Sequence, residues 1–326
     1  MLHRIVAGVA AAVAVLAAGG AAAQQYPSRP IQVVVPFAAG GPTDTVARTV
    51  AEAMAKQMGG SPIVIENLGG AGGTIGAAKV AKANPDGYTL LIHHIGMATA
   101  PALYRKLQYD VLKDFEYIGL INDVPMTLLT RNGFPAKTVK DLVPYLKANA
   151  NKVTLANAGI GSASHLCGLM FMSAIGQELT TVPYKGTAPA MADLMGGQVD
   201  LLCDQTTNTT QQIRGGRVQA LAITSPKRIE SLKELPTMAE SGFADFNISI
   251  WHGMYAPKGT PKAVVDKLVG ALQQALKDPA LNKRFADLGA ETVTQDRATP
   301  AALQKFVADE INRWGPVIKK AGVYAD

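Results

Sequence analysis

Residues 31–44 read IQVVVPFAAGGPTD, a β-branched run that leads through a glycine-containing turn toward a helix. The run at residues 31–37 is typical of a strand. Beyond the turn, apolar residues recur every fourth position and predict one buried helical face: Val46, Val50, Met54 and Met58. A strand followed by a turn and a packed helix is the repeating unit of parallel α/β folds.

The same pattern continues and then restarts in the middle of the chain. In the first unit, strands are expected at residues 62–66 and 89–95, with a helix at residues 74–83 between them. The second unit begins near Lys152. Its expected strands are residues 153–156, 180–184, 199–203 and 218–223, and its expected helices are residues 164–175, 188–195 and 207–214. The sequence therefore predicts two α/β units.

Two apolar stretches connect these units and are candidates for strands that cross between two lobes. They are residues 115–129 and residues 246–256. The tail from residue 261 onward is predicted to be helical, with an amphipathic segment at residues 301–320 that we expect to pack on the first lobe. The expected division is a first, discontinuous lobe of residues 26–124 plus 249–326, and an inserted second lobe of residues 125–248.

The first 23 residues have the pattern of a secretory signal peptide. Arg4 precedes an apolar run at residues 5–18, and the small residues 21–23 offer a cleavage site after Ala23. The alternative is a membrane anchor, but the run is shorter than the roughly 20 apolar residues that cross a bilayer. We therefore expect a periplasmic protein whose signal peptide is removed.

Charge and cysteine content narrow the class further. The formal net charge of +6 is spread along the chain without a basic stripe, so we expect no nucleic-acid partner. The excess of basic residues is compatible with an anionic ligand. We expect the protein to be a monomer. Cys167 and Cys203 are the only cysteines, and their separation excludes a CxxC redox motif. In an oxidising compartment they are expected to form a disulfide, and the alternative is two buried thiols.

The turn after the first strand is a candidate ligand site. In open α/β sheets, ligands bind beyond the carboxyl ends of strands, where helix N-termini present unpaired N–H groups that suit a carboxylate. Gly40 and Gly41 let the backbone approach a ligand, and Pro42 suits the first turn of a helix. The alternative is a plain turn in which Thr43 or Asp44 caps the helix.

Two further turns offer similar chemistry. The glycine-rich residues 67–76 match neither G-x-G-x-x-G nor a P-loop, but their amides could hold an oxyanion; the alternative is a flexible turn. In the second unit, one of Ser162 and Ser164 is expected to cap a helix, leaving the other as a ligand donor. Ser164 and His165 are adjacent in the sequence, which is an unfavourable arrangement for a nucleophile and its base. No GxSxG elbow occurs either, so the sequence does not favour a serine hydrolase.

Histidines and one aspartate complete the candidates. His93 and His94 are neighbours on an expected strand and should point to opposite faces, so we expect no metal site and no cofactor. His94 is either a ligand donor or a structural histidine. Asp204 and Gln205 follow the strand at residues 199–203, where they either face a ligand or cap the turn.

In its order of short motifs, the chain resembles the Bug (Bordetella uptake gene) receptors, the extracytoplasmic solute-binding components of tripartite tricarboxylate transporters. The resemblance rests on YPSRPI at residues 26–31, PFAAGGPTD at 36–44, GGTIG at 72–76, PDGYT at 85–89, SHL at 164–166, VPYKG at 182–186, LPT at 235–237 and APKGTP at 256–261. It implies a type II periplasmic-binding-protein (Venus flytrap) fold, with two α/β lobes joined by two crossover strands.

The resemblance also implies a function. A small organic acid would be captured between the lobes and delivered to integral-membrane transporter subunits, without catalysis. The alternatives are a secreted enzyme acting on a small carboxylate, for which no convergent base and nucleophile is visible, and a ligand-sensing receptor. The ligand itself stays open. The expected ligand-binding residues are Phe37, Ala39, Gly40, Gly41, Thr43, Asp44, Gly73, Thr74, His94, Ser162, Ser164 and Asp204.

Overall fold

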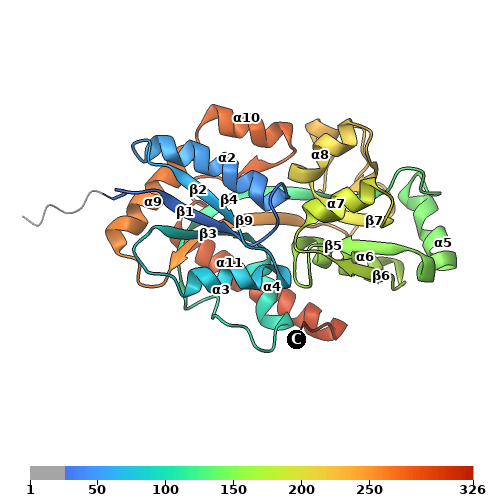
Figure 1. Cartoon of the computed structure of the whole chain (residues 1–326). Coiled ribbons are helices and arrows are strands. Elements are labelled where there is room, and N and C mark those ends of the chain that lie inside the picture. Colours follow the sequence, from blue (N-terminus) through green and yellow to red (C-terminus); the bar gives the residue numbers. More distant parts are fainter. Residues whose placement is uncertain (1–25, 326) are drawn as a thin grey trace, which may run out of the picture.

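The computed structural model describes residues 26–325 and forms two α/β lobes side by side (Figure 1). The expected signal peptide, residues 1–23, lies outside the described residues. The helices are α2 (Pro42–Gln57), α3 (Thr74–Ala81), α4 (Gly96–Leu103), α5 (Val139–Asn149), α6 (Ala163–Ile175), α7 (Thr187–Met195), α8 (Thr206–Arg214), α9 (Lys262–Ala275), α10 (Pro279–Asp287) and α11 (Pro300–Ala321). Within residues 26–325, none of them combines the length and hydropathy needed to cross a membrane.

The strands of both lobes belong to one continuous path of pairing. They are β1 (Ile31–Val35), β2 (Ile63–Asn67), β3 (Thr89–His94), β4 (Phe115–Thr130), β5 (Thr154–Asn157), β6 (Thr180–Pro183), β7 (Leu201–Gln205), β8 (Gln219–Ile223), β9 (Ser249–Pro257) and β10 (Glu291–Thr292). The main order is β2-β1-β3-β9-β4-β7-β5-β6, with β8 and β10 also paired to β4. In each lobe the pairs that follow crossover helices are parallel, as the alternating sequence pattern predicts.

Two antiparallel strands run through the middle and join the lobes. One end of β4 pairs with β9, and the other end pairs with β7 and β8 of the second lobe. At the far side of β9, the neighbour is β3 of the first lobe. The two crossover strands expected from the apolar connecting stretches are therefore present.

Helix α2 shows how the deciding sequence produces this architecture. Gly41 precedes the helix in an extended conformation, and Pro42 is its first residue, where a missing N–H leaves no bond unmade. The predicted apolar face is buried against the sheet. The helix ends at Gln57, just before Gly59 and Gly60, both of which have positive φ angles.

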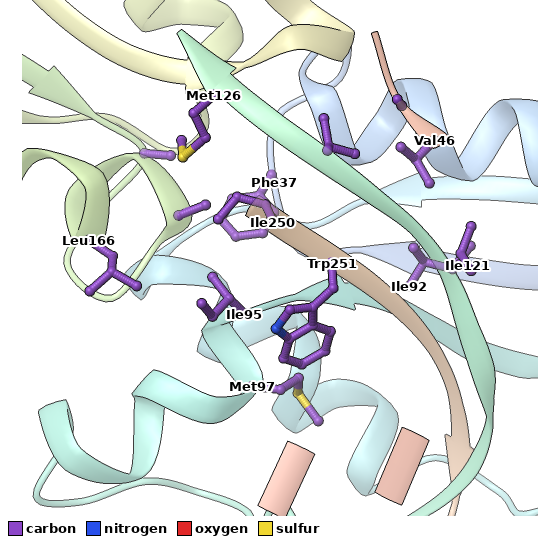
Figure 2. Packing of buried hydrophobic residues seen from close by; sticks show 14 of the residues in the cluster. Phe37, Val46, Ile92, Ile95, Met97, Ile121, Met126, Leu166, Ile250 and Trp251 are labelled. Atoms are coloured by element: carbon purple, nitrogen blue, oxygen red, sulfur yellow. The ribbon is translucent and has the colours of Figure 1, made fainter. Parts of the chain in front are cut away.

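Most of the apolar core is a single cluster that extends through both lobes. Figure 2 shows part of it around the crossover strands, where Ile250 and Trp251 come from β9 and Met126 comes from β4. Phe37 of the first lobe and Leu166 of the second belong to the same cluster. The core therefore reaches the region where the two lobes meet.

Helix α11 returns to pack on the crossover region. Its buried Glu310 accepts hydrogen bonds from the indole N–H groups of Trp251 on β9 (3.1 Å) and Trp314 (3.0 Å). Because a buried indole N–H needs an acceptor, this carboxylate fixes the C-terminal helix against β9.

Candidate functional site

A small cavity of about 10 Å³ lies between the lobes, at the carboxyl ends of β1, β3, β5 and β7. This is about the space of one water molecule, so a larger guest requires the walls to move apart. The first lobe contributes Phe37, Pro42, Thr43 and His94, and the second lobe contributes Ala158, Ala163, Ser164, Thr187, Asp204 and Gln205.

Four helices start at this cavity. Pro42, Ala163 and Thr187 are the first residues of α2, α6 and α7, and Gln205 is the N-cap of α8. Within residues 26–325, no side chain caps the start of α2, α7 or α8. Because the first N–H groups of a helix have no partner inside the helix and carry a partial positive charge, the walls favour an anion.

Asp44 holds the first-lobe turn in shape. Its carboxylate accepts hydrogen bonds from the Gly40 N–H, from Arg48 Nε and from Asn67 Nδ2, each at 2.9 Å. Burial raises the pKa of Asp44, but the bonds from Arg48, Gly40 and Asn67 outweigh it and hold that pKa below its usual value. The ionised side chain thus faces its own loop rather than the cavity.

His93 and His94 both contact Phe37, contrary to the expectation that they point to opposite faces. The His94 ring stacks on Phe37 at 4.6 Å between centroids, and the His93 ring meets Phe37 edge-on at 5.5 Å. The alternation fails because β3 ends at His94 and the chain turns directly into α4. The two rings lie 4.9 Å apart. Even so, no group of three metal-ligating side chains is found within the described residues.

His94 is suited to donate a hydrogen bond to a guest. Its Nδ1 accepts the Gly96 N–H at 3.0 Å, so in the neutral ring the proton lies on Nε2. Burial lowers the pKa of His94 to about 3, which keeps the ring neutral at physiological pH. His252 on β9 contacts the wall residue Thr43: its Nε2 lies 3.3 Å from Thr43 Oγ1, and its Nδ1 lies 2.8 Å from Asn122 Oδ1.

Of the two serines in the second-lobe turn, one caps a helix and the other lines the cavity. Ser162 is the N-cap of α6, and its Oγ accepts the His165 N–H at 3.3 Å. Ser164 lines the cavity, and its Oγ accepts the Ala158 N–H at 2.8 Å and lies 3.1 Å from Ser162 Oγ. The turn is therefore fixed by its own hydroxyls.

Asp204 is a buried carboxyl group on the cavity wall. Its Oδ2 accepts a 2.6 Å hydrogen bond from Asn208 Nδ2. Burial raises the pKa of Asp204 to about 6, and hydrogen bonds from Asn208, from the Gln205 N–H and from the Thr187 hydroxyl act in the opposite direction. The neighbouring Cys203 is bonded to Cys167 of α6, with 6.1 Å between the Cα atoms, which confirms the disulfide and ties α6 to β7.

Direct contacts between the lobes surround the cavity. The Ala38 N–H donates to Lys185 O at 3.0 Å. Tyr104 Oη donates to Ile160 O at 2.8 Å, and Thr99 Oγ1 donates to the carbonyl of the next residue, Gly161, at 2.7 Å. At Gly72, an added Cβ would lie 1.9 Å from Ile160 O, so only glycine lets the two loops meet this closely.

The structure brings five of the twelve expected ligand residues to the cavity wall: Phe37, Thr43, His94, Ser164 and Asp204. The others lie around it. Ala39 and Gly40 are exposed, Thr74 Oγ1 bonds to Ala71 O, and an added Cβ on Gly73 would meet His93 Nε2 at 2.7 Å. Gly41, Asp44 and Ser162 shape the turns.

Gln205, which the sequence placed beside Asp204 as either facing a ligand or capping the turn, also lines the cavity. The wall residues that were not expected are Pro42, Ala158, Ala163 and Thr187. Each lies at a strand-to-helix corner of the sheet, or begins the helix that follows. Taking every such corner of both lobes as part of one site would have found them, because the carboxyl ends of parallel strands share one edge.

A family model described as the tripartite tricarboxylate transporter family receptor, TctC, matches residues 46–323. The chain belongs to the TctC family. A UPF0065 protein from the TAR-I ttuE-ttuC' intergenic region of Agrobacterium vitis is 53% identical to it over 302 residues, covering 92% of this chain and 87% of that protein. TctC proteins are binding receptors rather than enzymes, which sets the enzyme alternative aside.

Solved structures agree with this assignment. The periplasmic binding protein BugD is 57% identical with a TM-score of 0.90, covering 92% of this chain and 100% of BugD, so the resemblance to Bug receptors is confirmed. MatC from Rhodopseudomonas palustris, solved with bound malate, is 41% identical with a TM-score of 0.86, covering 90% and 100%. A further R. palustris protein, solved with adipate, is 34% identical with a TM-score of 0.86, covering 92% and 99%. The fold is that of the periplasmic binding proteins.

Proposed function

We propose that this TctC-family protein is an exported receptor that binds a small organic carboxylate between its lobes and delivers it to the membrane subunits of a tripartite transporter. The observation that carries the proposal is the meeting of four helix N-termini at one interlobe cavity. A carboxylate supplies the negative charge and the acceptor oxygens that these unpaired N–H donors can bind. Malate in MatC and adipate in its R. palustris neighbour are guests of the same class.

In this proposal the residues divide into those that touch the ligand and those that hold the loops. Thr43, His94 and Ser164 offer polar groups at the wall, and Phe37 supplies an apolar surface. A supporting role is assigned to the seven expected residues that do not line the cavity: Ala39, Gly40, Gly41, Asp44, Gly73, Thr74 and Ser162. Asp44, for example, would act through the Gly40 N–H that it binds rather than by contact with the ligand.

The proposed lobes are residues 26–124 with 249–326, and residues 125–248. The pairing of β4 with strands of both lobes supports this division, since the chain crosses along that strand. A ligand that contacts both lobes favours the closed arrangement only by the contacts that it gains there. The periplasmic relative BugD supports export, and we propose that the mature receptor is a monomer with cleavage near Ala23.

A thermal-shift screen against an organic-acid panel tests the function. A ligand present at 100 times its Kd adds about 2.7 kcal/mol to the folded state, which corresponds to a rise in Tm of about 5–10 °C for domains of this size. At least one small carboxylate should produce such a rise, and its uncharged amide should not. A panel in which no acid moves the Tm would contradict the proposal.

A matched pair of variants locates the binding site. Ala163→Asp places a carboxylate at the first residue of α6, on the cavity wall, where it competes with the ligand for the same N–H groups. Ala301→Asp makes the same change at the second, exposed residue of α11. The first variant should lose binding and the second should keep it. Equal affinities for the two variants would place the carboxylate elsewhere.

A further inference from the structure

A row of buried polar side chains crosses the middle of the sheet and ends at the cavity. His94 of β3, His252 of β9 and Asn122 of β4 are direct neighbours on adjacent strands. None of the three is more than 3% exposed. Because β4 and β9 are the two crossover strands, the row connects the strands that join the lobes with the cavity wall at Thr43 and His94.

His252 stands between two hydrogen-bonding groups. Its Nδ1 lies 2.8 Å from Asn122 Oδ1, and its Nε2 lies 3.3 Å from Thr43 Oγ1. Burial, together with the nearby His94, lowers the pKa of His252 well below its usual value, so the ring is neutral. A neutral imidazole has one N–H donor and one bare acceptor nitrogen, so Nδ1 and Nε2 always have opposite roles.

The position of this one proton decides what Thr43 can offer to a guest. A threonine hydroxyl has a single hydrogen. If His252 Nδ1 carries the proton, Nε2 accepts the Thr43 hydrogen, and only oxygen lone pairs remain for the cavity. If Nε2 carries the proton, it donates to Thr43 Oγ1, and the hydroxyl hydrogen is free to bond to a carboxylate oxygen.

Asn122 can stabilise either position of the proton. Its side chain presents the amide oxygen to a protonated His252 Nδ1 or, after a half-turn of the amide, the NH2 group to a bare Nδ1. The half-turn breaks no other bond of the amide nitrogen, because Asn122 Nδ2 has no hydrogen-bond partner among residues 26–325. The orientation of this amide on β4 therefore sets which nitrogen of His252 is protonated.

We propose, on the basis of the proposed function, that His252 and Asn122 are positioning residues that make Thr43 a hydrogen-bond donor to the carboxylate. In the complex, the amide of Asn122 turns so that Nδ2 donates to His252 Nδ1. His252 Nε2 then donates to Thr43 Oγ1, and the Thr43 hydroxyl donates to the guest. All three bonds run in one direction, from the crossover strands toward the cavity, and bonds in such a chain strengthen one another.

Nitrogen NMR of the histidine side chains tests this direction, because protonated and bare ring nitrogens have well-separated chemical shifts. The signals of His252 are assigned by their loss in His252→Gln. The acid of the panel that binds most tightly is added to saturation, with malate and adipate among those tested. In the complex, Nε2 should carry the proton and Nδ1 should be bare. A proton on Nδ1 in the complex would overturn the proposal.

A double-mutant cycle shows whether His252 acts through Thr43. Thr43→Val removes the hydroxyl and His252→Leu removes its donor, and each should weaken binding of the same acid by about tenfold. The double variant should bind about as well as either single variant, because both changes remove one contact. His252→Gln, whose amide can donate to Thr43 Oγ1, should keep most of the parent affinity.

Thr260→Val is the matched control for Thr43→Val. It removes another buried hydroxyl, which bonds to Pro257 O outside the cavity, and should keep the parent affinity. If His252→Leu does not fold, the spectrum of the parent complex still decides the direction of the row.

The outcomes separate the positioning role from the function on which it rests. If the effects of Thr43→Val and His252→Leu simply add, the positioning role is refuted while carboxylate binding stands. Parent-like affinity in His252→Leu refutes it as well. If no acid in a broad panel binds, the proposed function fails, and the positioning role fails with it.

Discussion

Substituting Gly72 should prevent the lobes from closing without unfolding either of them. An added Cβ would lie 1.9 Å from Ile160 O, and ordinary contact begins at 3.4 Å, so the loops must separate by about 1.5 Å there (3.4 − 1.9). That movement breaks the bonds from Tyr104 to Ile160 O and from Thr99 to Gly161 O. At about 0.5–1.5 kcal/mol each, the loss of these two bonds weakens ligand binding by about 5- to 150-fold.

Gly60→Ala is the matched control for this change. Gly72 and Gly60 both have positive φ angles, of 60° and 78°, so alanine costs about 1 kcal/mol of backbone strain at either position. An added Cβ at Gly60, however, meets no atom within 4 Å. Calorimetric titration with the ligand found by the panel measures affinity, and small-angle scattering measures closure. Parent-like affinity and closure in Gly72→Ala, or an equal loss in Gly60→Ala, would refute the reasoning.

Three further predictions concern stability. Burial raises the pKa of Asp204 to about 6, so between about pH 4 and 6 the folded protein binds more protons than the unfolded chain and loses stability as the pH rises. At pH 7.5 the free energy of unfolding of Asp204→Asn, measured in urea, should therefore be higher than that of the parent by on the order of 1–3 kcal/mol. At pH 4 the two proteins should be equally stable. Replacing both Cys167 and Cys203 by alanine opens a 36-residue loop and should cost about 4 kcal/mol, and a loss below about 1 kcal/mol would contradict this. Glu310→Ala leaves two buried indole N–H groups without their acceptor and should cost about 2–6 kcal/mol, whereas Glu310→Gln, which retains an acceptor oxygen, should cost less.

The elements that periodicity predicted well are those with one exposed and one buried face. The strand expected at residues 31–37 is β1, Ile31–Val35, and the amphipathic segment expected at residues 301–320 is α11, Pro300–Ala321. Helix α4 was missed because nearly all its residues are buried, so it has no polar stripe, and it contains Pro101. Helix α5 was missed as well; it contains Pro144, which reads as a break in a helical pattern.

The candidate site was only partly predictable because much of it is backbone. Glycine turns and helix starts indicate where amides gather, and that pattern led to the corners of the sheet that line the interlobe cavity. Sequence could not tell which side chain at each corner faces the guest. Asp44 turns back to bind Gly40 and Arg48, whereas Asp204 lines the cavity. The sequence placed Asp204 after a strand, but it lies within β7, whereas Asp44 is the third residue of α2 and is held there by Arg48 and Asn67.

The different positions of these two aspartates indicate which lobe makes the contacts that favour closure around a ligand. A guest held by the first-lobe amides alone would bind the open and closed arrangements equally and could not shift the balance between them. Closure must therefore be driven by groups of the second lobe, which reach the guest only when the lobes meet. Ser164 and Asp204 lie on the second-lobe wall of the cavity, where they can make such contacts. On this reasoning the contacts between the ligand and the second lobe supply the free energy of closure, so an acid that does not make them would bind weakly and leave more of the receptor open.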